Sequence, residues 1–456
     1  MQELFSDTIA AISTPQGQGA IGIVRMSGPR SREILKSIFF QKKKSLLRPY
    51  HLVRGSIQDG KEILDDVLAV FMPEKKSYTG EDLVEIQGHG SPFILSEILD
   101  LVVQKGARLA KPGEFTFRAF MNGKLDLAQA EAVIDLMDAK SRKALQICHQ
   151  HLGGRFSKEI REIREGLLEL LVHTEASLDF STEDIDVFSS FSMLEKLKPI
   201  QNKINTLLKT YDQGKFHLEG VRVAIVGRPN VGKSSLLNAL LQYERAIVSE
   251  EAGTTRDTLE ETIEYRGIGL RMIDTAGIRK TSHSVEKIGI QHTIEKIREA
   301  DIVLIVLDSS QEPHTEDFEI LDVVGPKKKI LVFNKMDLGV EASTEIISKK
   351  FLDPQVFISA LRRQGTEGLL DILYREVIQG EFNSENILLT KLQHKDSLEK
   401  ALGYISFYEE GLAEKRPLEF LAVDLRSAIE ELETTIGKIS LEDVYDRIFS
   451  SFCIGK

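Results

Sequence analysis

The sequence of 456 residues contains few cysteines and no long apolar run. Its two cysteines, Cys148 and Cys453, cannot form a disulfide framework, and neither belongs to a Cys-x-x-Cys pair. No apolar run approaches the roughly 18 residues that cross a bilayer, so no membrane span is expected. Residues 1–7 lack the basic and apolar regions of a signal peptide. These absences predict a reducing, cytoplasmic setting.

Positive charge is also scarce. The chain has 59 Lys and Arg against 70 Asp and Glu, a net charge of −11. This acidic balance argues against a protein that binds nucleic acid over most of its surface, but it permits a local basic patch. Residues 42–44 with Arg48, and residues 327–329, are candidates, although a solvated surface run explains each as well. The acidic segment 179–186 matches no EF-hand spacing and is interpreted as a loop between helices.

The chain is longer than a domain with a single hydrophobic core usually is, so about three domains are expected. Residues 1–118 combine strand-like alternation with helical spacing at 31–40 and 93–104, which predicts an α+β domain. The expected strands cover residues 7–13, 22–26, 66–71 and 83–86.

From about Leu125 the apolar spacing becomes helical, and it resumes after residue 379. The apolar faces of such helices must be buried, so we expect the two sets to pack together as a helical bundle around an inserted α/β block. The predicted division is an N-terminal domain at 1–118, helices at 119–218, the inserted block at 219–379 and further helices at 380–456.

Residues 227–235 read Gly-Arg-Pro-Asn-Val-Gly-Lys-Ser-Ser, between the apolar run 221–226 and a run of helix formers. A strand, a glycine loop and a helix in this order predict a P-loop, in which backbone N–H groups and the helix N-terminus face a phosphate. Lys233 supplies charge for the outer phosphates, and the Ser234 hydroxyl is a ligand for Mg²⁺. The expected nucleotide contacts here are Asn230, Val231, Gly232, Lys233, Ser234 and Ser235.

Three further motifs, each directly after an apolar strand, indicate GTP. An aspartate at 274 reaches Mg²⁺ through water, and Gly277 brings its N–H to the γ-phosphate. Asp337 accepts two N–H groups of guanine that adenine does not offer in that arrangement. The loop at 359–361 offers a backbone N–H to the guanine O6. The expected contacts are Asp274, Thr275, Ala276, Gly277, Asn334, Lys335, Asp337, Ser359, Ala360 and Leu361.

Residues 249–257 form the predicted switch segment, in which Thr255 completes the Mg²⁺ shell and senses the γ-phosphate. Ile278 stands where Ras-type enzymes have the glutamine that orients the attacking water, and it cannot do so. Glu286 is the nearest carboxylate for that role, with a plain surface glutamate as the alternative. The expected switch contacts are Ser249, Glu250, Glu251, Ala252, Gly253, Thr254 and Thr255.

Over essentially its whole length, the chain resembles the family of tRNA modification GTPases called MnmE or TrmE. The motifs of the inserted block are shared with ribosome-assembly GTPases. The more specific signals lie at residues 78–82, 87–90, 112–116, 123–131 and 452–456. The resemblance implies a multidomain fold: an α+β domain that binds folate and dimerises, an α-helical bundle, and an inserted α/β P-loop GTPase domain of the Ras-like type.

The resemblance also implies that G-domain dimerisation activates hydrolysis, with K⁺ in place of an arginine finger. The K⁺ ligands would be Asn230, Thr254 and the backbone carbonyls of Ser249 and Glu251. The family's catalytic glutamate falls on Glu286, which fits the absence noted at Ile278.

The family's folate-binding positions fall on Arg25, Glu85, Lys124 and Lys456. A cationic pair suits the glutamate tail of a folate, and a carboxylate suits the donor face of a pterin; ordinary surface charges are the alternative. Cys453 is implied to lie near the folate and to matter for tRNA modification, with a small buried thiol as the alternative. Cys148 lacks further zinc ligands and is interpreted as structural.

The implied activity is that of a homodimeric, Mg²⁺- and K⁺-dependent GTPase. With the flavoprotein MnmG (also called GidA), in a heterotetramer or larger complex, it would add an aminomethyl or carboxymethylaminomethyl group at C5 of the wobble uridine, position 34, of certain tRNAs. 5-Formyl-tetrahydrofolate or 5,10-methylene-tetrahydrofolate would carry the one-carbon unit.

Two other classes stay open. A ribosome-assembly GTPase is disfavoured because no basic RNA-binding domain follows the G domain. A folate-dependent one-carbon transferase with a merely regulatory G domain is the second alternative.

Overall fold

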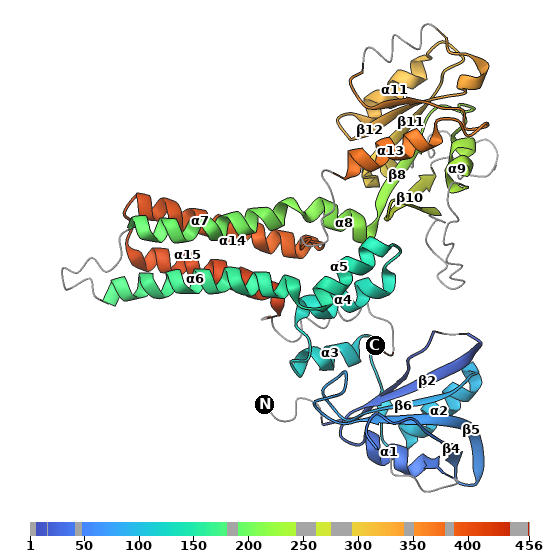
Figure 1. The fold of residues 1–456 in the computed structure, drawn as a ribbon, viewed down its shortest axis with the longest axis vertical. Helices are drawn as coiled ribbons and strands as arrows, with labels where there is room; N and C mark the ends of the chain where they lie inside the picture. The colour runs from blue at the N-terminus through green and yellow to red at the C-terminus, as the bar shows by residue number, and fades with distance from the viewer. Residues whose placement is uncertain are drawn as a thin grey trace. The chain divides into compact units, whose positions relative to one another are not determined.

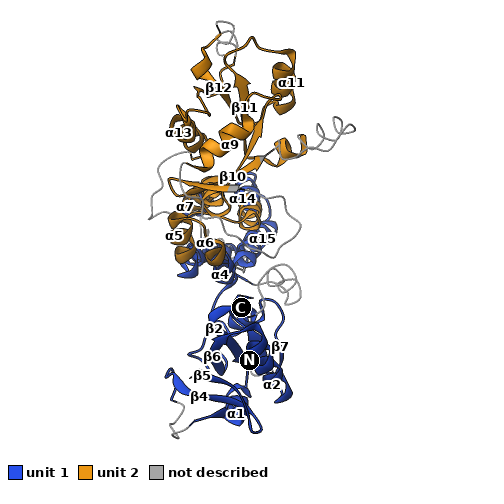
Figure 2. Cartoon of the chain, turned by 90° about the vertical axis from the view of Figure 1, so that its right-hand side faces the viewer, with its two compact units in different colours: residues 1–134, 151–197, 403–456 blue, residues 135–150, 198–402 orange. Residues whose placement is uncertain are grey.

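The structure is a computed structural model. It describes residues 6–15, 17–41, 48–179, 190–242, 261–274, 294–341, 351–378, 387–437 and 455. Contacts divide the chain into two compact units, coloured separately in Figure 2. Unit 1 comprises residues 1–134, 151–197 and 403–456, and unit 2 comprises residues 135–150 and 198–402. The predicted domain boundaries at 118, 218 and 379 remain predictions.

Unit 1 contains a seven-stranded sheet with the order β3-β4-β5-β6-β2-β1-β7 (Figure 1). Its neighbouring strands are antiparallel except for the parallel pair β1–β7. The strands are β1 (Ile9–Ile12), β2 (Gly19–Ser27), β3 (Phe39–Phe40), β4 (Val53–Asp59), β5 (Glu62–Met72), β6 (Leu83–Gly90) and β7 (Arg108–Leu109).

Helices α1 (Ser31–Ile38) and α2 (Pro92–Gln104) cover one face of this sheet, and their apolar stripes pack on the inward residues of β2, β5 and β6. The predicted α+β fold is confirmed. The helix expected over residues 31–40 ends earlier, at Ile38, because Phe39 and Phe40 pair with β4 as strand β3.

Among the described residues, the remaining helices that lie wholly in unit 1 are α3 (Glu114–Met121), α6 (Arg155–Asp179) and α15 (Leu418–Ile436). Helices α6 and α15 pack against each other, and the apolar faces that their spacing predicted are buried. Arg164 donates its Nε–H to Glu433 Oε1 at 2.6 Å across this contact. Helices α4 (Leu127–Asp138), α5 (Arg142–Leu152), α7 (Ser190–Lys209) and α14 (Leu392–Ala413) contribute residues to both units.

Unit 2 contains a six-stranded sheet with the order β13-β12-β11-β8-β10-β9. All neighbouring strands are parallel except the β9–β10 hairpin. The central strands read as continuous apolar runs because helices cover both of their faces. The strands are β8 (Val221–Val226), β9 (Glu261–Tyr265), β10 (Ile268–Asp274), β11 (Ile302–Asp308), β12 (Lys329–Asn334) and β13 (Gln355–Phe357).

Two apolar clusters fill the two faces of this sheet. One contains residues of α9 (Lys233–Leu241) and α13 (Thr366–Val377), and the other contains residues of α11 (Thr315–Val324). Helix α8 (Tyr211–Glu219) leads into β8. The predicted α/β fold of the inserted block is therefore confirmed. Among the described residues, no helix is long and apolar enough to cross a membrane.

Candidate functional site

The loop at 227–232 connects β8 to α9 (Figure 1). Three of its residues, Gly227, Asn230 and Gly232, have positive φ. Asn230 has a φ of 64° and Gly232 a φ of 100°. A Cβ atom on Gly227 would lie 2.4 Å from the Val306 carbonyl oxygen, and one on Gly232 would lie 2.3 Å from Asn334 Nδ2. Glycine is therefore required at both positions by close approach as well as by conformation.

Lys233 begins α9, and its amine folds back over the loop. Its Nζ donates to the carbonyl oxygens of Gly227 at 2.7 Å and Arg228 at 2.9 Å. Ser234 and Ser235 follow on the exposed first turn of the helix. The first N–H groups of a helix have no intrahelical acceptor and carry partial positive charge. An amine, hydroxyls and a helix N-terminus thus converge here, as a phosphate chain requires.

Asn334, the last residue of β12, joins two of the predicted motifs. Its Nδ2 donates to the Val231 carbonyl at 2.8 Å, and its Oδ1 accepts from the Ala360 N–H at 2.9 Å. The side chain is buried. Because the two partners lie 103 and 26 residues away, this single amide fixes the distance between the P-loop and the loop that follows β13.

Lys335 pairs with a carboxylate that the sequence analysis missed. Its Nζ lies 2.6 Å from Oδ2 of Asp308, the last residue of β11. Burial alone would raise the pKa of Asp308, but hydrogen bonds from Lys335 and Ser310 outweigh it and hold that pKa below its ordinary value. The only sequence signal for Asp308 is an acidic residue at the carboxyl end of an apolar run.

Asp337 and the loop after β13 lie together at the same sheet edge. The Asp337 side chain is 6% exposed, and its Oδ2 lies 3.7 Å from Arg362 Nε. The Arg362 N–H in turn donates to the buried Ser359 hydroxyl at 3.1 Å. Leu361, between them, is 81% exposed. A nearly buried carboxylate therefore stands beside the loop whose N–H groups were expected to face guanine.

Asp274 ends β10 in register with Ile225 of β8, so its backbone lies near the start of the P-loop. The other residues predicted for the nucleotide lie outside the described residues. They are Ser249, Glu250, Glu251, Ala252, Gly253, Thr254, Thr255, Thr275, Ala276, Gly277 and Glu286.

Two of the predicted folate positions form an ion pair in unit 1. Arg25 of β2 and Glu85 of β6 are cross-strand partners, and Arg25 donates from Nε at 3.0 Å and from Nη2 at 2.8 Å to Glu85 Oε1. The Arg25 guanidinium carbon also lies 5.7 Å from the centre of the Phe115 ring. Lys124 is exposed, and its Nζ donates to the Lys75 carbonyl at 3.0 Å. Lys456 and Cys453 lie outside the described residues.

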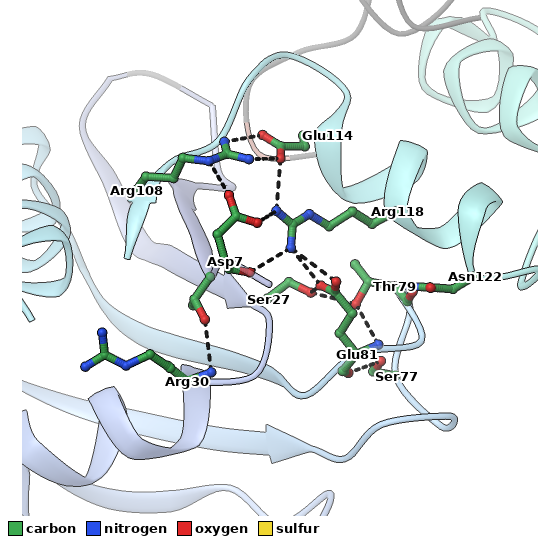
Figure 3. A network of polar contacts seen from close by, with 11 residues as sticks. Asp7, Ser27, Arg30, Ser77, Thr79, Glu81, Arg108, Glu114, Arg118 and Asn122 are labelled. Atoms are coloured by element: carbon green, nitrogen blue, oxygen red, sulfur yellow. Dashed lines mark hydrogen bonds and ion pairs between the residues drawn. The ribbon is translucent and has the colours of Figure 1, made fainter. Parts of the chain in front are cut away.

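Phe115 belongs to α3, which a network of charges holds in place (Figure 3). At its centre is Arg118, whose side chain is fully buried. Its Nη2 donates to Asp7 Oδ1 at 2.7 Å and to Glu114 Oε1 at 3.1 Å, and its Nη1 donates to Glu81 Oε1 at 3.1 Å. The network therefore fixes α3, and with it Phe115, beneath Arg25.

The carboxylates of this network differ in proton affinity. Burial raises the pKa of Glu81 above its ordinary value, despite Arg118 and a hydrogen bond from Ser27. Burial acts in the same direction on Asp7 and Glu114. At both carboxylates the hydrogen bonds from Arg108 and the charge of Arg118, with the Lys111 N–H as a further donor to Glu114, outweigh burial, so both pKa values lie below the ordinary range.

Known proteins match this chain over nearly its whole length. The family description "MnmE helical domain" matches residues 127–453, and "GTP-binding protein TrmE N-terminus" matches residues 8–124. The tRNA modification GTPase MnmE of Aquifex aeolicus is 45% identical over 453 residues, which cover 99% of this chain and 100% of that protein. The proteins of the same name from Alkaliphilus oremlandii and Clostridioides difficile are each 41% identical over 99% of this chain and 100% of their own length.

The chain belongs to the MnmE family.

The resemblance to the MnmE family that the motifs indicated is thereby confirmed. Two of the family motifs have a structural role. Residues 78–82 include Glu81, and residues 112–116 include Glu114; both side chains accept hydrogen bonds from Arg118. The second motif also includes Phe115, whose ring lies against Arg25. Their structural role was missed, because nothing in their spacing indicates that they meet.

The amines of residues 327–329 of this MnmE-family chain each donate to a main-chain carbonyl, and Lys328 is exposed. Lys327 donates to the Arg298 carbonyl, Lys328 to the Glu376 carbonyl at 3.2 Å and Lys329 to the Gly325 carbonyl at 2.7 Å. The interpretation of this segment as a solvated surface run or a basic patch remains a prediction. Residues 42–44 lie outside the described residues.

Cys148 is buried, and burial raises the pKa of its thiol to about 12, so the thiol stays protonated. This supports its interpretation as structural. In the described ranges, no group of three or more His, Cys, Asp or Glu side chains could hold a metal ion.

Proposed function

We propose that this protein is a K⁺-activated GTP hydrolase that acts with the flavoprotein MnmG on certain tRNAs. It adds an aminomethyl or carboxymethylaminomethyl group at C5 of the wobble uridine, and a tetrahydrofolate supplies the one-carbon unit. It works as a homodimer in the cytoplasm. The observation that supports the proposal most is the Asn334 amide, which joins the P-loop to the loop after β13 in a chain of the MnmE family.

In this proposal the described residues bind and orient GTP. Lys233 and the first N–H groups of α9 stabilise the phosphates, because they present positive charge at one point. Asp337 accepts from guanine, and its burial gives the selectivity, since a base without those donors leaves a desolvated carboxylate unpaired. Asn334 holds the phosphate side and the base side at a fixed distance.

The side chains near the phosphate loop suit the cations that the family uses. Ser234 and Asn230 are exposed and offer hard oxygen atoms, the ligand type that Mg²⁺ prefers. Ser234 with Thr255 would hold Mg²⁺, and Asn230, Thr254 and the carbonyls of Ser249 and Glu251 would hold K⁺. Bound there, the cations offset charge that develops in the transition state. Glu286 orients the attacking water.

The N-terminal residues suit a folate in part. The Glu85 carboxylate suits the donor edge of a pterin, and the exposed Lys124 amine suits an anionic tail. Arg25 orients Glu85, because its guanidinium fork is already directed at that carboxylate. Cys453 takes part in the modification chemistry, and Lys456 completes the folate site.

The sheet face opposite α1 and α2 supports the proposed homodimer. Ile21 of β2 is 65% exposed and Leu68 of β5 is 40% exposed, on the same side as Arg25. Exposed apolar side chains on the open face of a sheet favour burial against a second surface.

The experiment that tests this function is the steady-state rate of GTP hydrolysis in KCl and in NaCl at matched ionic strength. We expect stimulation of roughly tenfold or more by K⁺ alone, because a fixed cation replaces the arginine finger. Asn230→Ala should remove the difference between the salts, and Glu286→Ala should slow hydrolysis in both. Equal wild-type rates in the two salts would contradict the K⁺ assignment and favour a conventional switch that waits for an outside activator.

A further inference from the structure

The end of β11 and the turn after it, residues 308–310, bond to the loop after β12 that contains the proposed guanine contacts. Ser309 is fully buried, and both its N–H and its hydroxyl donate to the Asn334 carbonyl oxygen, each at 2.8 Å. A carbonyl oxygen has two lone pairs, so it accepts both bonds at once. Ser309 therefore fixes the peptide group between Asn334 and Lys335.

The backbone of Lys335 is left-handed, with a φ of 68°. A residue other than glycine takes this conformation at a cost in free energy, so the surrounding structure must hold it there. On the far side of Lys335, the Met336 N–H donates to the Ile358 carbonyl at 3.1 Å. The peptide groups before and after Lys335 are thus both fixed by other segments of the chain.

The amine of Lys335 is fixed as well. Its Nζ donates to Asp308 Oδ2 at 2.6 Å, while Asp308 Oδ1 accepts from the Ser310 N–H at 3.0 Å and from the Ser310 hydroxyl at 2.6 Å. The Asp308 side chain is 3% exposed, so both of its buried oxygens have donors. Hydrogen bonds between charged groups are the stronger kind. The four-carbon stem of Lys335 is therefore held at both of its ends.

Asp337, two residues further on, is the carboxylate that the proposed function assigns to guanine. Arg362 Nε lies 3.7 Å from Asp337 Oδ2, beyond hydrogen-bond distance, and the Arg362 side chain is 62% exposed. The Lys335 amine is bonded to Asp308 instead. Without Asp308, the flexible stem of Lys335 would be free to carry its amine to Asp337. A carboxylate paired in that way accepts less well from a base.

We propose that Asp308 and Ser309 are positioning residues for guanine recognition. Ser309 fixes the peptide before Lys335, and Asp308 keeps the lysine amine away from Asp337, so that the Asp337 carboxylate stays available to the base. Neither Asp308 nor Ser309 touches the nucleotide. The proposal rests on the proposed contact of Asp337 with guanine, and it adds a source of selectivity outside the nucleotide motifs.

The test compares the affinities of the full-length protein for GDP and IDP, measured by displacement of a fluorescent GDP analogue. IDP lacks the 2-amino group of guanine, so it gives Asp337 one donor fewer. Asp308→Asn removes the charge that holds Lys335, and the GDP affinity should fall about tenfold but the IDP affinity only about threefold. Ser309→Ala removes one of two bonds to the Asn334 carbonyl, and the GDP affinity should fall about fivefold, again more than that of IDP.

A double-mutant cycle distinguishes positioning from a general structural role. In Lys335→Met no amine remains for Asp308 to hold or for Asp337 to attract. Adding Asp308→Asn to that variant should therefore not lower the GDP affinity further. A carboxylate that only supports the fold would lower the affinity by the same factor with and without the lysine.

Two matched controls lie in the same unit. Asp301 directly precedes β11, at the end away from the nucleotide motifs, where it pairs with Lys215 Nζ at 3.4 Å and accepts from the Arg222 N–H at 2.9 Å. Asp301→Asn thus removes the charge of another lysine-paired aspartate. Ser141 is buried, and its hydroxyl accepts from the Ala144 N–H at 3.1 Å, so Ser141→Ala is the control for loss of a buried hydroxyl. Both should bind GDP and IDP as wild type does.

The proposal is overturned if either Asp308→Asn or Ser309→Ala binds GDP as tightly as wild type, while wild type prefers GDP to IDP. It is also overturned if the affinities for GDP and IDP fall by the same factor, or if Asp308→Asn acts equally with and without Lys335. A wild-type protein that binds GDP and IDP equally would contradict the guanine contact of Asp337 itself, and with it the positioning role.

Discussion

The two candidate sites position their residues by different means. At the nucleotide site the positioning groups are mostly main chain: the glycines of the P-loop, the Val231 carbonyl and the Ala360 N–H, joined by the neutral amide of Asn334. In the N-terminal part, charged side chains position the residues: the Arg25–Glu85 pair and the fully buried Arg118.

The difference predicts where a single substitution does most damage. Loss of a neutral hydrogen bond that leaves one partner buried costs about 1–3 kcal/mol. Removal of one member of a buried ion pair costs about 3–5 kcal/mol, because a charge stays buried without its partner. The N-terminal part should therefore be the more fragile of the two regions, although the nucleotide site carries the clearer sequence motifs.

The largest expected effect is that of Arg118→Met, which keeps the volume but removes the charge. Asp7, Glu81 and Glu114 would then lose their shared cation, and the free energy of unfolding should fall by about 3–5 kcal/mol. Urea unfolding followed by far-ultraviolet circular dichroism measures this, since the chain has no tryptophan for fluorescence.

The matched control for this prediction is Arg54→Met, because Arg54 is 81% exposed and lies 3.8 Å from Asp66. A surface pair contributes about 0–1 kcal/mol, so this variant should differ little from wild type. Equal stability of the two variants would contradict the fragility expected for the N-terminal part.

The next effect concerns ligand binding more than stability. In Asn334→Ala the Val231 carbonyl and the Ala360 N–H both lose a buried partner, so the two loops are no longer held at one distance. We expect the affinity for a fluorescent GDP analogue to fall by about a hundredfold, equivalent to about 3 kcal/mol. Asn238→Ala is the control, since Asn238 is exposed on α9. Unchanged nucleotide affinity in Asn334→Ala would contradict the proposal that this amide fixes the distance between the two loops.

These two regions also differ in how well sequence predicts them. Strands β8, β10, β12 and β13 were predicted because each precedes a recognisable motif, and local motifs dictate main-chain geometry. Strands β9 and β11 and helix α11 were not predicted, since no motif follows them. The Asp308 carboxylate was missed for the same reason, although it holds Lys335.

In the N-terminal part, alternation predicted most strands, but it could not identify the buried charges. Arg118 is buried only because Asp7, Glu81 and Glu114 meet it, and Asp7 lies 111 residues away. Which of many charged residues is enclosed depends on tertiary pairing, and the hydrophobic pattern does not record that pairing.

The smallest expected effect is a difference in how the free energy of unfolding depends on pH when Glu114 or Glu81 of the charged network is replaced. The pKa of Glu114 is lowered in the folded protein, so its charged form contributes stability above its ordinary pKa of 4.5 and that stability is lost as pH falls through the folded value. Glu114→Gln should therefore cost about 1.5–3 kcal/mol near neutral pH, the range for hydrogen bonds to charged groups, and progressively less in acid.

Glu81 has the opposite sign, since its folded pKa lies above 4.5. Its charged form is disfavoured in the folded state, so wild type gains stability relative to Glu81→Gln as pH falls through the raised pKa. Near neutral pH Glu81→Gln should change the free energy of unfolding by less than about 1 kcal/mol, because lost hydrogen bonds and relieved burial of charge oppose each other. Urea unfolding at several values between about pH 4 and pH 8 measures both variants. Parallel pH profiles would show that the network acts as one uniform cluster of charge, whereas diverging profiles would show that the effect of burial is offset at Glu114 and not at Glu81.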